Sequence, residues 1–204
     1  MSRIAVEICC ENLADAVAAE AAGADRLELA QALELGGLTP SPGLALVVGA
    51  RVTMPFVAMV RPRGGDFVYA DAELHVMERD AGLLLEAGAA GIVFGCLTKD
   101  DRIDERACER LIDAADGAEV VFHRAFDRLK DPLGALAVLI DLGVTRVLTS
   151  GGAKTALEGA DRIRALIERA EGRIEVLPGG GIREENVEQL VRRTRCTQVH
   201  LSRR

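Results

Sequence analysis

The chain has 204 residues, 49% of them apolar, and no long low-complexity tract, which suits a single domain over residues 1–204 with a sizeable core. Its 25 lysines and arginines stand against 32 aspartates and glutamates, and the net charge of −7 argues against a broad nucleic-acid or acidic-membrane surface. Because no apolar run is long enough to span a bilayer and "MSRIAVEICC" lacks the features of a signal peptide, we expect a soluble, cytoplasmic protein.

Short apolar runs alternate with amphipathic stretches along the chain. In order, the runs predict strands at residues 4–8, 26–29, 56–61, 91–95, 119–123, 146–150, 174–178 and 198–202. Helical spacing is clearest at 11–24, 71–89 and 184–194. Eight βα units predict an α/β protein with a TIM (β/α)8 barrel fold. A doubly wound sheet is the alternative, but it gives no reason for the count of eight and usually carries a G-x-G-x-x-G turn after its first strand.

The end of the predicted barrel is unusual, because only two residues follow Ser202 and the helix after strand eight is missing or truncated. If Gln198, His200 and Ser202 point inward, Val199 and Leu201 point outward and need cover. We expect flanking helices or a neighbouring subunit to cover them, in a homo-oligomer such as a dimer or tetramer.

Charged residues fall on the inward faces of several predicted strands. Counting by two places Glu7 with Cys9, Arg26 with Glu28, and Met59 with Arg61 and Arg63 on inner faces. Since the carboxyl ends of barrel strands meet in one basin, polar groups there are candidates for chemistry. His75 falls in a helix and is expected to be a surface residue. The candidate general acids and bases are Glu7, Glu28, His123 and His200.

The segment "RPRGGDF" places Arg61 and Arg63 at the end of strand three, before two glycines and Asp66. Two guanidiniums can hold a carboxylate or phosphate, while Asp66 can fix one of them. The alternative is a structural network in which Arg61 neutralises Glu7 and Glu28.

Glycine-rich turns after strands six and seven add to this prediction. "TSGG" and "PGGGI" let the backbone approach an anion, and the helix after "PGGGI" directs N–H groups toward it. The further candidates for binding an anionic substrate are Arg124, Thr149, Ser150, Gly151, Gly179, Gly180, Gly181 and Ser202.

Several motifs in order, among them "VEICCENLADA", "VRPRGGDFVYAD", "VVFHRAFD", "GVTRVLTSGG" and "VLPGGGI", resemble the CutC family of copper homeostasis proteins. The resemblance covers essentially the whole chain. It implies a TIM barrel, a cytoplasmic location, homo-oligomerisation and a role in copper binding or tolerance. Many members continue beyond strand eight, and many have a cysteine where this chain has Ala30.

Cysteine placement bears on the copper prediction. The five cysteines include no CxxC pair, so we expect reduced thiols rather than disulfides or a structural zinc site. Cu(I) prefers soft sulfur ligands, and Cys9 and Cys10 are the candidates, although a regular strand would turn Cys10 to the opposite face. Ala30 leaves Cys9 without a second thiol on strand two, and Met59 is its nearest soft companion.

Three functions stay open from the sequence. The first is a protein that binds copper, as Cu(I), in copper homeostasis. The second is a TIM-barrel enzyme acting on a small anionic substrate, phosphorylated compounds included. The third is a scaffold whose barrel is purely structural.

Overall fold

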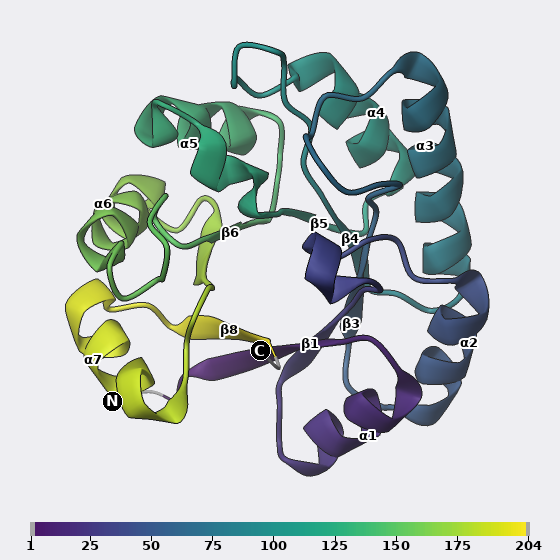
Figure 1. Ribbon diagram of the computed structural model, residues 1–204, viewed down its shortest axis with the longest axis horizontal. Coiled ribbons are helices and arrows are strands. Elements are labelled where there is room, and N and C mark those ends of the chain that lie inside the picture. Colours follow the sequence, from purple (N-terminus) through teal and green to yellow (C-terminus); the bar gives the residue numbers. More distant parts are fainter. Residues whose placement is uncertain (1–2, 203–204) are drawn as a thin grey trace.

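The computed structural model describes residues 3–202 and confirms the barrel. Eight parallel strands form one sheet in the order β7-β6-β5-β4-β3-β2-β1-β8, which curls into a ring with helices on its outside (Figure 1). The strands are β1 (Ala5–Cys10), β2 (Arg26–Leu29), β3 (Phe56–Met59), β4 (Gly91–Phe94), β5 (Glu119–Phe122), β6 (Arg146–Thr149), β7 (Glu175–Pro178) and β8 (Gln198–Ser202).

Seven α-helices and two short 3-10 helices connect the strands within residues 3–202. They are α1 (Leu13–Ala21), η1 (Leu33–Leu35), α2 (Pro42–Arg51), α3 (Asp71–Glu86), α4 (Glu105–Ala114), η2 (Arg124–Arg128), α5 (Pro132–Asp141), α6 (Ala160–Ala170) and α7 (Glu184–Thr194). None of these helices has both the length and the apolar character needed to cross a membrane.

Several element boundaries differ from the predicted ones by a few residues, and for two of them the local reason is clear. Strand β3 ends at Met59 rather than at residue 61, because the Arg61 amide leaves the sheet and donates to the Thr39 hydroxyl. Helix α1 is shorter than 11–24, since the Asn12 side chain caps its start and Gly23 takes a positive φ after its end.

The barrel has two separate apolar regions. A large outer core lies between the strands and the helices, and a small inner cluster fills the barrel, formed by Cys9, Ala30, Val57, Met59, Val93 and Val121. Cys9 belongs to the inner cluster and Cys10 to the outer core, as strand alternation predicts. Side chains that follow the inner cluster toward the strand ends therefore meet inside the ring.

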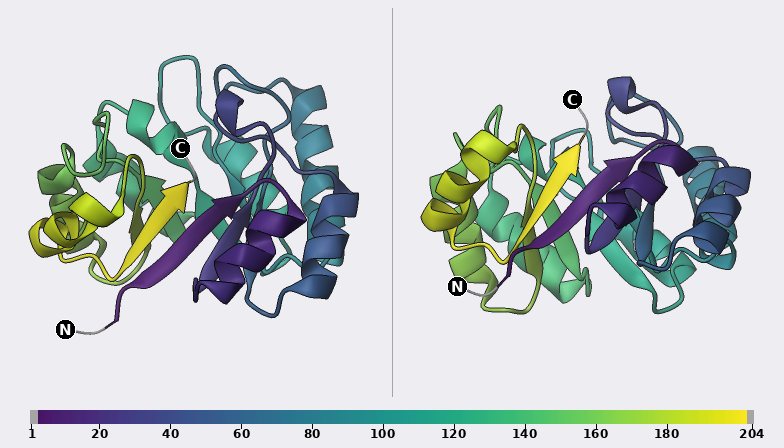
Figure 2. Two further views of the ribbon diagram at one scale, coloured as in Figure 1. Left: turned by 60° about the horizontal axis from the view of Figure 1, so that its bottom comes forward. Right: turned by 90° about the horizontal axis from the view of Figure 1, so that it is seen from below.

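The ring closes weakly between β7 and β8. Strand β8 pairs with β1 over five residues, but it meets β7 through a single bridge between Gly179 and His200. No helix crosses the outer face of β8 within the described chain, and the two strands β1 and β8 lie open between α1 and α7 (Figure 2). Val199 is nevertheless buried, while Leu201 is only half-buried and borders a cavity of about 610 Å³ together with Val6, Ile182 and Val187.

Candidate functional site

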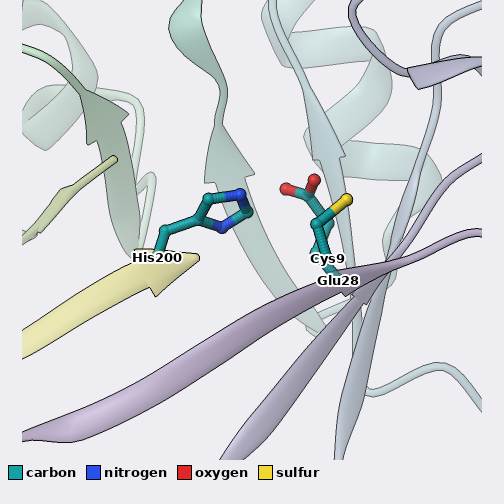
Figure 3. A group of neighbouring side chains, drawn as sticks. All are labelled: Cys9, Glu28 and His200. Atoms are coloured by element: carbon teal, nitrogen blue, oxygen red, sulfur yellow. The ribbon is translucent and has the colours of Figure 1, made fainter. Parts of the chain in front are cut away.

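Three predicted residues from neighbouring strands meet inside the barrel. Cys9 on β1, Glu28 on β2 and His200 on β8 are all buried, and one ligand atom from each lies within 4.8 Å of the others. The register explains the meeting, because Cys9 lies opposite Glu28 and β1 also pairs with β8. Figure 3 shows the ring of His200 pointing toward the carboxyl group of Glu28, with the Cys9 sulfur on the far side of that group.

Glu7 supports this cluster from behind. Its carboxylate bonds to His200 Nδ1 at 2.7 Å through Oε1 and accepts from Arg26 Nε through Oε2. The bond at Nδ1 leaves Nε2 as the ring nitrogen free for another partner. Burial alone would raise the pKa of Glu7, but His200 and Arg26 lower it well below its usual range. Glu7 is therefore an ionised residue that fixes the His200 ring.

The environment sets the protonation of the other three groups. Burial, and then the nearby Glu28 carboxyl, raise the pKa of the Cys9 thiol well above its usual value. Burial also raises the pKa of Glu28, and the charge of Glu7 adds to the effect. Burial would lower the pKa of His200, but the carboxyl groups of Glu28 and Glu7 raise it. The charges of Glu7, Glu28 and His200 therefore influence one another, and the Cys9 thiol is protonated at neutral pH.

A wider polar network continues from Glu7 through the barrel. Arg26 also donates to the Gln198 side chain, which donates to Glu175, and Arg146 lies between Glu175 and Glu119. Arg26 points inward, as strand alternation predicted. The alternative network in which Arg61 neutralises Glu7 is wrong, because Arg26 lies directly opposite Glu7 in the register and forms the ion pair.

Arg61 and Arg63 have different surroundings. Arg63 bonds to Glu73, to Asp66 and to the carbonyls of Gly64, Asp66 and Val68, so its guanidinium is committed to its own loop and to helix α3. Asp66 thus fixes a guanidinium as predicted. Arg61 is buried, donates to backbone carbonyls of the neighbouring loops and lies beside the Tyr69 hydroxyl.

The glycine turns lie beside a network centred on Asp127, a residue that was not among the predicted site residues. The Asp127 carboxylate accepts from the Thr149 hydroxyl, from the Ser150 hydroxyl and amide, from the Gly152 amide and from Arg124. Arg124 also donates to the Ser150 hydroxyl, and the Gly151 amide donates to Thr149. Asp127 could have been found in the sequence as the last residue of "FHRAFD", four residues after His123.

The turn after β7 packs closely against β6 and β8. A Cβ at Gly179 would lie 2.5 Å from Leu148 Cδ1 and 3.2 Å from His200 Cβ, and Gly180 and Gly181 both have positive φ. Glu184 and Glu185 occupy the first turn of α7, so its positive dipole end is already compensated. Ser202 ends β8 opposite Cys9, and its carbonyl accepts from Arg183.

His123 is buried at the end of β5, away from this turn. Its Nδ1 accepts from the Ala125 amide, and its ring lies 4.9 Å from the ring of Phe67. Burial and the Arg61 guanidinium lower the pKa of His123 to about 3.

His123 stays neutral in the folded protein but takes up a proton more easily in the unfolded chain. It should therefore lower the free energy of unfolding in acid. Unfolded chains bind this proton below about pH 6.5 and folded ones only near pH 3, so stability falls as pH drops through that range. The slope approaches 1.4 kcal/mol per pH unit. Urea unfolding of His123→Gln across these pH values should lack this slope, whereas His75→Gln, on the surface of α3, should retain it.

The fold and the buried polar cluster define a class of protein, a (β/α)8 barrel that gathers a thiol, a carboxyl group and an imidazole on β1, β2 and β8. The CutC family model matches residues 4–204, and the chain belongs to the CutC family.

Individual relatives agree with this assignment. A CutC family protein of Treponema denticola is 50% identical over 99% of this chain and 82% of its own length. The copper homeostasis protein cutC homolog of Homo sapiens is 47% identical over 98% of this chain and 73% of its own. The crystal structure of a CutC protein from Streptococcus agalactiae has a TM-score of 0.94 and 37% identity, covering 98% of this chain and 99% of that one.

Proposed function

We propose that the protein binds a copper ion inside the barrel, as part of the copper homeostasis for which its human relative is named. The observation that supports this proposal is the cluster of Cys9, Glu28 and His200, whose ligand atoms lie within 4.8 Å of one another. These groups supply a sulfur, an imidazole nitrogen and a carboxylate oxygen. One ion could contact all three after small side-chain movements.

The surroundings suit a metal ligand set. Histidines that bind metals usually donate their other ring N–H to a carboxylate, and Glu7 occupies that position beside His200. Glu28 Oε2 is buried without a hydrogen-bond partner among residues 3–202. Thiolate and imidazole are ligands that copper prefers, and Met59 packs in the same inner cluster as Cys9. Cys10 lies on the other face of β1 and is not part of the proposed site.

The test is an anaerobic titration with Cu(I) against a competing chelator. We expect one copper ion per chain, and Cys9→Ser and His200→Gln should each weaken binding at least ~100-fold through loss of a ligand. Cys108→Ser is the matched control, because Cys108 is also a buried free thiol but lies on α4 in the outer core. Binding that survives unchanged in Cys9→Ser would exclude this site.

We also propose that the protein works in the cytoplasm as a homo-oligomer. All five cysteines are free, as in a reducing compartment. The half-buried Leu201 and the cavity beside β8 form an apolar surface that a second copy would cover. A monomer in light scattering at micromolar concentration would contradict the oligomer. The enzyme predicted as an alternative stays a prediction.

A further inference from the structure

Arg61 is a buried cation without a counter-ion. Its side chain is 4% exposed, yet it forms no ion pair within residues 3–202. One guanidinium nitrogen donates to the carbonyls of Leu35 and Gly37, at 3.0 and 3.2 Å, and the other donates to the Gly65 carbonyl at 3.1 Å. Its Nε has no partner. Burying an unpaired charge costs several kcal/mol, so natural proteins pair such charges.

Arg146, also buried, shows how such a charge is usually neutralised. Arg146 lies between the carboxylates of Glu119 and Glu175, which neutralise it inside the barrel. No carboxylate takes that place beside Arg61 within the described residues. Asp66, the acid in its own loop, pairs with Arg63 instead.

Two further hydrogen-bond donors near Arg61 also lack acceptors. The ring of Phe67 packs against both the Arg61 guanidinium, 4.8 Å from its centroid, and the His123 ring. Since His123 Nδ1 accepts from the Ala125 amide, the proton of the neutral ring is on Nε2, which is buried and unpartnered. The buried hydroxyl of Tyr69 likewise has no acceptor for its proton, and its oxygen lies beside the Arg61 guanidinium, whose charge and side-chain hydrogen bond lower the pKa of Tyr69 against the effect of burial.

We propose that a small oxyanion, a carboxylate or a phosphate, binds here as the counter-ion of Arg61. Arg61 Nε, His123 Nε2 and the Tyr69 hydroxyl would donate to its oxygens, which supplies the acceptor that all three lack. This site is separate from the proposed copper ligands and does not require metal.

Phe67 lies between this site and the surface. Its ring packs against the Arg61 guanidinium and also lines an outer cavity of about 420 Å³ together with Val68, Leu97 and Lys99. An anion that came from this cavity would have to displace the Phe67 ring to reach the donors.

The test uses the metal-free protein, so its outcome is independent of copper binding. Calorimetry and thermal unfolding would be followed with inorganic phosphate, acetate and oxalate, each against sodium chloride at equal ionic strength. We expect saturable binding of phosphate or of a carboxylate, and the arm that binds identifies the class. Arg61→Met and His123→Gln should each weaken that binding at least tenfold.

Arg63→Met is the matched control, because it removes a neighbouring guanidinium whose donors are already used. It should keep the anion response even if it lowers the melting temperature. If Arg61→Met does not fold, His123→Gln decides the outcome. The proposal would be overturned if the wild type showed no more heat of binding or thermal stabilisation with these anions than with chloride. It would also be overturned if the Arg61 or His123 variant bound the anion with unchanged affinity.

Discussion

Replacing Glu7 with alanine should destabilise the folded protein by about 3 to 5 kcal/mol, the range for removing one partner from a buried ion pair. Glu7 is 2% exposed, and its two oxygens bond to Arg26 and to His200. Its loss would leave two buried groups without their acceptor and a cavity between β1, β2 and β8. Urea denaturation at neutral pH measures the change.

A surface glutamate provides the control for this prediction. Glu168 pairs with Arg164 one turn away on α6 and is largely exposed, so Glu168→Ala should cost less than about 0.5 kcal/mol. Glu7→Gln keeps the shape of the side chain and should fall between the two. A loss of less than about 1 kcal/mol for Glu7→Ala would show that the network around it does not stabilise the barrel.

Gly91→Ala is expected to be similarly damaging, at about 3 kcal/mol or more, because it introduces a clash with backbone. A Cβ at Gly91 would lie 2.2 Å from the Glu119 carbonyl oxygen. Gly91 on β4 pairs with Glu119 on β5 and with Val57 on β3, so it cannot move without disturbing both pairings. Thermal unfolding would show the loss.

Gly82→Ala is the matched control for that substitution. Gly82 lies within α3, and a Cβ there would meet no atom within 4 Å. Because alanine favours the helix, this change should stabilise the protein by about 0.5 to 1 kcal/mol. Equal effects of the two substitutions would mean that the close approach at Gly91 is not maintained in solution.

The fold could be predicted because its signals are local. Each strand is a short apolar run and most helices have polar caps, so all eight strands were found within a few residues of their bounds. The inward direction of Glu7, Cys9 and Glu28 followed from strand alternation alone. The exact ends could not be predicted where a side chain intervenes, as Thr39 does at Arg61.

The partners within the site depend on strand register, which could not be predicted from the residue pattern of each strand alone. From the sequence, Ala30 left Cys9 without a second thiol on strand two, and this weakened the prediction of a copper site. The register instead sets Cys9 opposite Glu28, and the pairing of β1 with β8 brings in His200. The same register places Glu7 opposite Arg26, with which it forms an ion pair, so Glu7 does not neutralise Arg61.

The single bridge between β7 and β8 has a consequence for how quickly a bound ion is released. His200 is carried by a strand that is fully paired on one side only. A fluctuation that opens this seam would move the imidazole away from Cys9 and Glu28 without unfolding the remaining seven strands. The lifetime of a metal complex at this site would then follow the local opening rate of β8, which amide exchange at residues 198–202 reports.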